Sequence, residues 1–174
     1  MSKTSLQFTL MFIVMVIAQS VIFNRLVLFS VALAFVFIYF IIKLPVTLGA
    51  SKVMALSFLL GLCVDIFSDT PGINSLACTC LGGCRHTVLR LYVPREDDVT
   101  HRIPSMRTLG AAVFSKYVVT MSLFYCLMVT LIEAFAFFHP LLMLERIVAS
   151  TLLTALLILG IDSISSRSEF ASAS

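Results

Sequence analysis

The chain has 174 residues, of which 60% are hydrophobic and 12% are charged, and its formal net charge is +3. Soluble domains carry about 45–50% apolar and about 25% charged residues, and a fold of this size buries only about 70% of the surface that its unfolded chain exposes. The composition therefore excludes a soluble enzyme, a disordered chain and a secreted disulfide scaffold. It indicates a protein surrounded mostly by lipid.

Six apolar stretches are long enough to cross a membrane as helices, because about 20 mostly apolar residues span a hydrocarbon core of about 30 Å. The fourth stretch is the weakest, since it contains Arg85, His86 and Arg90. The predicted fold class is an all-α integral membrane protein, a bundle of six transmembrane helices in a single domain over residues 1–162. The expected spans are residues 5–23, 26–44, 50–67, 73–93, 109–138 and 141–162.

The segments outside the spans are short. We expect the first span to be a retained helix, because its apolar stretch is longer than that of a usual cleavable signal peptide. Residues 68–72 read as a turn, and residues 94–108 as a cytoplasmic loop that is either a docking site or a solvated connector. The Ser-rich residues 163–174 are expected to form a disordered cytoplasmic tail. Strands are not expected, because the apolar runs are continuous rather than alternating.

The basic residues define an orientation. Six spans place both termini on one side, and positive charges favour the cytoplasmic side. Only Arg25 and Arg146 fall on the outer side, while Arg85 and Lys116 lie within spans nearer the inner end. The predicted inner set is Lys3, Lys43, Lys52, Arg90, Arg95, Arg102, Arg107 and Arg167. We therefore expect both termini in the cytoplasm.

Ionisable side chains gather at the outer ends of the spans. Such groups are costly at membrane depth and tend to pair or to line a cavity, although long side chains also extend to the interface. We expect Arg25 and Glu145 to reach the interface. For the shorter Asp65, pairing with Arg146 or Arg25 is as well supported as a place at the interface. The predicted outer polar layer is Arg25, Asp65, Asp69, Glu133, Glu145 and Arg146.

Arg85 lies about 18 Å along the fourth span, past the membrane midplane. The favoured interpretation is that it extends inward to the cytoplasmic interface. Pairing within the bundle is a second interpretation. In a third, Arg85, Arg90 and Lys116 form a basic pocket for anionic lipid headgroups.

Small residues recur every four positions on the third and fourth spans. Ser57 and Gly61 lie on the former, and Ser75, Thr79 and Gly83 on the latter. This spacing lets helix backbones approach closely in lipid. The two faces either meet each other within the hairpin or contact a helix of another protein.

We expect neither a catalytic site nor a metal site in this sequence. Cys78, Cys80 and Cys84 resemble a metal cluster, but on a helix Cys78 and Cys80 point about 200° apart. No metalloprotease, nucleophile-elbow or phosphate-loop motif occurs in the sequence. We predict a protein that is not an enzyme, with no cofactor, no metal and no nucleic acid partner.

The hairpin between the third and fourth spans carries a recognisable stretch. Residues Gly61–Ala77 read Gly-Leu-Cys-Val-Asp-Ile-Phe-Ser-Asp-Thr-Pro-Gly-Ile-Asn-Ser-Leu-Ala. This resembles the signature of the rod shape-determining protein MreD family, Gly-Leu-x-x-Asp-x-x-Ser-x-Thr-Pro followed by Gly and an apolar segment. Four further stretches look like one branch of that family, at residues 36–45, 89–95, 131–138 and 150–154.

The resemblance implies structural roles for the signature residues Asp65, Ser68, Thr70, Pro71 and Gly72. Ser68 or Thr70 would cap the fourth span or bond to Asp65, and Pro71 would lie near its first turn. Asn74 departs from the pattern, because many relatives have His at that position.

The resemblance also implies a function. MreD-like proteins are multi-pass inner-membrane scaffolds of the bacterial cell-elongation machinery. They bind MreC and, through it, help regulate the RodA glycosyltransferase and its penicillin-binding transpeptidase under the MreB filament. Their fold is similar to that of the substrate-binding subunits of energy-coupling-factor transporters. The alternative is therefore a vitamin-type transporter subunit, with an outer site lined by Asp65, Glu133 and Arg146.

Overall fold

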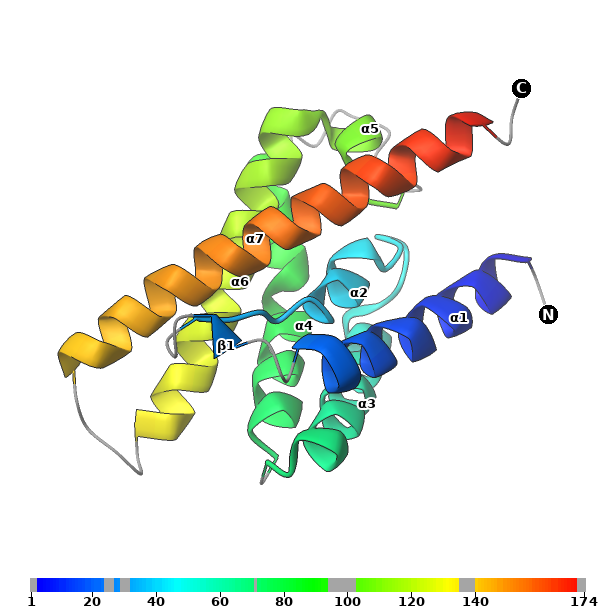
Figure 1. Cartoon of the computed structure of the whole chain (residues 1–174). Helices are drawn as coiled ribbons and strands as arrows, with labels where there is room; N and C mark the ends of the chain where they lie inside the picture. Colours follow the sequence, from blue (N-terminus) through cyan, green and yellow to red (C-terminus); the bar gives the residue numbers. More distant parts are fainter. Residues whose placement is uncertain are drawn as a thin grey trace.

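The computed structural model describes residues 3–23, 27–28, 32–70, 72–93, 103–134 and 140–171. Within these residues the protein is mostly helical (Figure 1). The N-terminal helix α1 covers Lys3–Ala18 and continues as a π-helical turn, η1, over Gln19–Phe23. The longer helices that follow are α3 (Ala50–Ser68), α4 (Ile73–Tyr92), α6 (Ala111–Ala134) and α7 (Pro140–Ala171).

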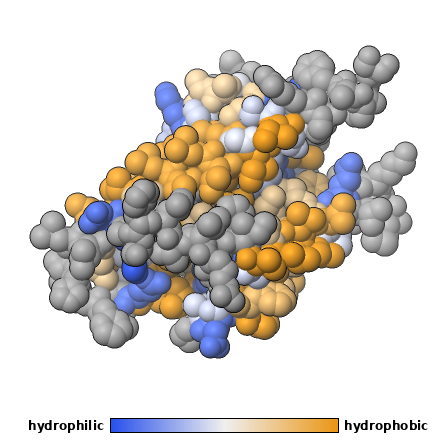
Figure 2. All heavy atoms as spheres, viewed as in Figure 1, coloured by the Kyte–Doolittle hydropathy of each residue, from blue (hydrophilic) through white to orange (hydrophobic). Residues whose placement is uncertain are grey.

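Three of these helices are long and apolar enough to cross a membrane, by length and composition: Ala50–Ser68, Ala111–Glu133 and Met143–Ser165. A shorter apolar helix covers Gln7–Val21. Their outward faces carry large hydrophobic side chains, and Figure 2 shows apolar side chains over the exposed surface of α7 and α1. Lipid is the solvent that suits such a surface, since soluble monomers rarely expose apolar patches of this extent.

The prediction of a continuous helix over residues 26–44 is wrong. This stretch contains two paired two-residue strands, β1 (Val27–Leu28) and β2 (Ala32–Leu33), then residues 34–37 without a regular helix or strand, then the six-residue helix α2 (Ile38–Lys43). Residue propensity does not explain this break, because Val, Ile, Phe and Tyr are more frequent in residues 36–44, which contain α2, than in residues 26–35. A short apolar run does not by itself distinguish a buried helix from a buried strand.

Two other predicted boundaries also change. The chain from residue 163 onward was expected to be disordered, but α7 continues as a helix to Ala171. The end of the expected loop at 94–108 contains a short helix, α5 (Met106–Leu109), before α6 begins at Ala111. Residues 94–102 lie outside the described residues.

The core is built around α2. Phe37, Ile38, Ile41 and Ile42 are fully buried, and α2 contacts α1, α4 and α6 (Figure 1). A helix that is apolar on every side is stable only when it is covered on every side. Around it, α3 packs most extensively on α4, α4 on α6, and α6 on α7, while β2 lies against α7.

Candidate functional site

The carboxylate of Asp65 lies at the centre of the α3–α4 hairpin. Its Oδ1 accepts hydrogen bonds from the Thr70 hydroxyl at 2.5 Å and from the Asn74 backbone N–H at 3.0 Å. Its Oδ2 accepts from the Ser75 backbone N–H at 2.8 Å and from the Ser75 hydroxyl. The first N–H groups of a helix have no partner within the helix and favour an anion. Asp65 therefore caps α4 from the preceding helix.

Asn74 extends this network into the bundle. Its side-chain amide donates to Asp65 Oδ1 at 3.0 Å and to the Thr70 hydroxyl at 3.2 Å, while its Oδ1 accepts from the Tyr125 hydroxyl of α6 at 2.5 Å. From the sequence, Asn74 was only a departure from the family pattern, with no polar contact predicted for it. The signal was present, since Asn follows the signature by two residues on the first turn of α4, but its partner on α6 is distant in sequence.

The small residues of α3 and α4 lie at their contact. A Cβ on Gly61 would be 2.6 Å from the Asn74 carbonyl oxygen and from the Ser75 Cα, so only glycine permits this approach. Further along, Ser57 faces Gly82, where an added Cβ would lie 2.6 Å from the Ser57 hydroxyl. The close contact thus involves Gly82 rather than the expected Gly83.

The other signature and stripe residues have different surroundings. Thr79 donates to the Ser75 carbonyl of its own helix at 2.7 Å. An added Cβ on Gly83 would lie 3.6 Å from the Met54 sulfur, an ordinary contact. Gly72, with φ +80°, is the residue before α4 and adopts a backbone conformation that suits glycine. Pro71 lies outside the described residues.

The predicted outer polar layer is divided. Arg146 lies 3.5 Å from Glu133, and both side chains are more than a third exposed, so the interpretation that paired Asp65 with Arg146 is wrong. Among the described residues, the hydrogen bonds to the Asp65 carboxylate come from Thr70, Asn74 and Ser75 of the hairpin. Asp69 is exposed and ends α3 in the left-handed conformation at φ 54°. Glu145 is exposed, as expected, and Arg25 lies outside the described residues.

Side chains form hydrogen bonds with the backbone of residues 33–36, which are not helical. Ser150 and Thr154 of α7 accept from the Leu33 and Phe35 backbone N–H groups at 3.0 and 3.1 Å. On the other side, Gln19 donates to the Ala34 carbonyl at 2.9 Å and accepts from the Val36 N–H at 3.1 Å. Backbone groups at membrane depth must be satisfied within the protein, and these three side chains provide the partners.

Arg85 neither reaches the interface nor forms a pocket with Arg90 and Lys116. It is fully buried, and its guanidinium donates to the Leu44 carbonyl and, at 3.5 Å, to the Pro45 carbonyl. These carbonyls follow the C-terminal end of α2, where a cation is favourable. Arg90 and Lys116 are exposed. The favoured interpretation of Arg85 from sequence is therefore wrong.

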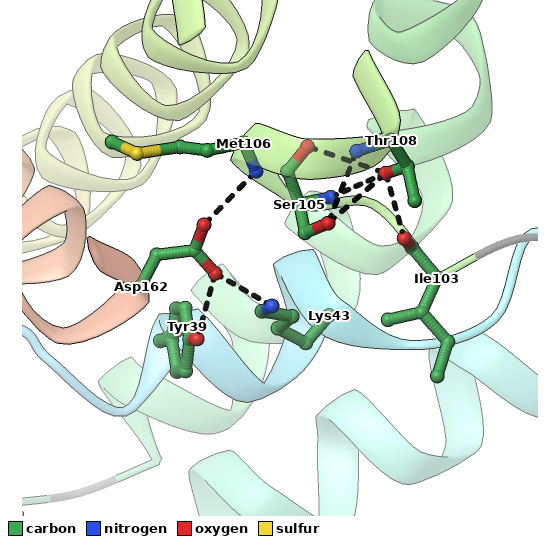
Figure 3. A network of polar contacts seen from close by, with 7 residues as sticks. All are labelled: Tyr39, Lys43, Ile103, Ser105, Met106, Thr108 and Asp162. Atoms are coloured by element: carbon green, nitrogen blue, oxygen red, sulfur yellow. Dashed lines mark hydrogen bonds and ion pairs between the residues drawn. The ribbon is translucent and has the colours of Figure 1, made fainter. Parts of the chain in front are cut away.

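A second buried carboxylate, Asp162 of α7, was not singled out from the sequence. It forms an ion pair with Lys43 at 2.6 Å and accepts from the Tyr39 hydroxyl at 2.9 Å and the Met106 N–H at 3.0 Å (Figure 3). Lys43 and Asp162 end two spans that the charge pattern places at the same side. Because both residues were expected at the same depth, the sequence could have indicated this ion pair.

A cavity of about 100 Å³ lies beside the Asp65 network. Its lining includes Gln19, Ser68, Thr70, Asn74 and Glu133, together with Phe35 and Phe37. The polar atoms of Gln19, Thr70 and Asn74 are engaged in the hydrogen bonds described above. Drug-sized ligands occupy pockets of about 300–1,000 Å³, so this cavity has room for water or a few atoms.

Within the part of the chain that the structure describes, fold and site together define a mostly helical protein with three candidate membrane-spanning helices and a hydrogen-bonded α3–α4 hairpin. Comparisons with family models, curated proteins and solved structures found no match.

Proposed function

We propose that this protein is a non-catalytic membrane scaffold or regulator of a bacterial cell-elongation complex. It binds MreC in the cytoplasmic membrane and, through it, acts on RodA, its penicillin-binding transpeptidase and, indirectly, MreB. The observation that carries the proposal is the Asp65 network. Two residues of the MreD-like signature, Asp65 and Thr70, bond to each other. Asp65 also accepts from Asn74 and Ser75 at the start of α4, as is expected of a structural element that joins the two helices.

The small cavity also favours a scaffold over a transporter subunit. A solute-binding subunit needs free polar groups that converge on a pocket of adequate size. Here Asp65 is 4% exposed and fully engaged with Thr70, Asn74 and Ser75. Glu133 and Arg146, the other residues of the alternative site, pair with each other at the surface.

We further propose that the chain crosses the membrane six times, with both termini in the cytoplasm. Three contacts join residues 33–43 to α7, and they follow the same order along both segments: Leu33 with Ser150, Phe35 with Thr154, and Lys43 with Asp162. Residues 33–43 therefore run parallel to α7. Between Ser150 and Asp162, α7 rises about 18 Å. In this proposal the second crossing is broken, with the strands β1 and β2 in its outer half and the helix α2 in its inner half. Protein covers it, as irregular backbone in a membrane requires.

Affinity purification from native membranes in mild detergent tests the function. Stoichiometric recovery of MreC, with RodA or its transpeptidase in smaller amounts, is the expected result. Asp69→Asn, at an exposed position, should recover MreC like the wild type. Asp65→Asn should recover less, because the hairpin loses its cap. Recovery of ATPase subunits with a shared transporter membrane protein would instead identify a solute-binding subunit and overturn the proposal.

A further inference from the structure

Three elements that are distant in sequence meet at Asp162. Lys43 and Tyr39 come from α2, Met106 is the first residue of α5, and Asp162 itself belongs to α7 (Figure 3). Asp162 is fully buried, and the side chain of Lys43 is 15% exposed. The Lys43 ammonium balances the carboxylate charge, and it also lies 5.5 Å from the centre of the Tyr39 ring.

The segment that Asp162 holds is ordered but short. Helix α5 has four residues and begins with a reciprocal capping box between Ser105 and Thr108. Their bonds, including Ser105 N–H to the Thr108 hydroxyl at 2.9 Å, lie within the segment. Isolated helices of this length are not stable in water. The position of α5 therefore depends on contacts with the bundle. The hydrogen bond from the Met106 N–H to Asp162 is a directional contact of this kind.

We propose that Asp162 is a positioning residue that couples the packing of α2 against α7 to the place of the surface segment 103–109. One carboxylate oxygen accepts from α2 and the other from α5. A shift of α2 along α7 must therefore turn the carboxylate and move or release Met106. The coupling is reciprocal, so a protein that binds segment 103–109 shifts the balance between arrangements of α2 and α7. This device does not depend on the proposed function.

The test compares two double variants that both remove the buried charges. In Lys43→Met/Asp162→Asn, the asparagine keeps an acceptor for the Met106 N–H and a polar contact for Tyr39. In Lys43→Met/Asp162→Leu, a side chain of similar size has neither. Hydrogen–deuterium exchange of the purified protein in detergent is measured for peptides covering residues 103–109 and, as a reference, residues 57–82.

We expect the leucine variant to exchange about fivefold faster than the asparagine variant at residues 103–109, as for the loss of one buried hydrogen bond. Residues 57–82 should exchange at the same rate in both. Equal exchange at 103–109 would overturn the proposal, as would an equal acceleration in both segments, because Asp162 would then act on general stability alone.

A third variant keeps the test decisive if the leucine variant fails to fold. Met106→Pro removes only the donor N–H, at the first helical position, where proline is tolerated. Ser105 is already extended, at φ −157° and ψ 168°, which suits a residue before proline. With Met106→Ala as its control, the proline variant should exchange faster at Thr108 and Leu109. Unchanged exchange there would contradict the proposed tether.

Discussion

Asp65 shows how one buried carboxylate can organise a hairpin. It accepts from two backbone N–H groups and three side-chain donors, drawn from Thr70, Asn74 and Ser75. Hydrogen bonds to a charged group contribute about 1.5–3 kcal/mol each, and a buried donor left without its partner is costly. The residue therefore stabilises the hairpin by fixing the start of α4 against the end of α3.

Asp65→Asn should lower the free energy of unfolding by about 2–3 kcal/mol, because asparagine brings an amide group among donors and lacks the charge. The measurement is thermal unfolding in detergent, read by circular dichroism. Asp69→Asn is the matched control, since Asp69 is exposed and asparagine tolerates its left-handed backbone. Equal melting temperatures for both variants would contradict the role of Asp65.

Gly61 is the second residue on which the hairpin depends. Gly61→Ala should destabilise the protein by about 1–3 kcal/mol, because its Cβ would meet backbone atoms of Asn74 and Ser75 at 2.6 Å. Gly160→Ala on α7 is the control, since nothing lies within 4 Å of an added Cβ there. That control should unfold at the wild-type temperature or slightly above it. A Gly61→Ala variant as stable as the control would mean that the helices separate easily.

At the scale of elements, the α7 hydroxyls substitute for a neighbouring strand. Removing both, as Ser150→Ala/Thr154→Ala, should cost about 1 kcal/mol, since hydrogen bonds inside membrane proteins contribute about 0.6 kcal/mol each on average. Amide exchange at Leu33 and Phe35 should accelerate, because both N–H groups lose their acceptors.

A conservative change provides the control for that pair. Thr154→Ser retains the hydroxyl and should protect the Phe35 amide as the wild type does. If the double alanine variant leaves amide exchange at Leu33 and Phe35 unchanged, groups other than these two hydroxyls hold residues 33–36 in place.

The helices around the hairpin follow from the sequence more closely than the rest. The helices expected at 50–67 and 73–93 appear as α3 and α4 within about a residue, because charges, Pro and Gly mark their ends. The helix expected at residues 26–44 does not form as predicted, since apolar content there indicates burial and does not determine backbone conformation. The helical residues 163–171 were mistaken for a disordered tail because serine-rich composition alone carried that prediction.

The candidate site divides in the same way. The bond from Thr70 to Asp65 joins residues five apart, and the family signature named both. Leu44, which accepts from Arg85, and Tyr39, which donates to Asp162, lie 41 and 123 residues away in sequence, on a segment whose path the sequence does not specify. Charge gives an expected depth in the membrane, whereas the neighbours of a side chain around the bundle require the fold.

At the scale of the molecule, the apolar surface of α7 predicts where a charged side chain would prevent insertion into lipid. Leu152 is 58% exposed near the middle of α7, and Ile164 is 72% exposed towards its end. Leu152→Lys should reduce membrane yield strongly, since a charge at a span centre costs about 2.5–3.5 kcal/mol on insertion scales. Ile164→Lys should be tolerated, because its amine reaches the interface. Equal yields, measured by membrane fractionation, would contradict this placement of α7.

Helix α7 has 32 residues and is therefore about 48 Å long, against a hydrocarbon core of about 30 Å. The nine residues after Asp162 continue the helix to Ala171, and in Figure 1 this end stands clear of the other elements. A fluorophore or tag fused there is carried on a rigid arm instead of a loose tether. Its orientation would report rotation of the helix itself, so polarised fluorescence could follow the bundle in living cells.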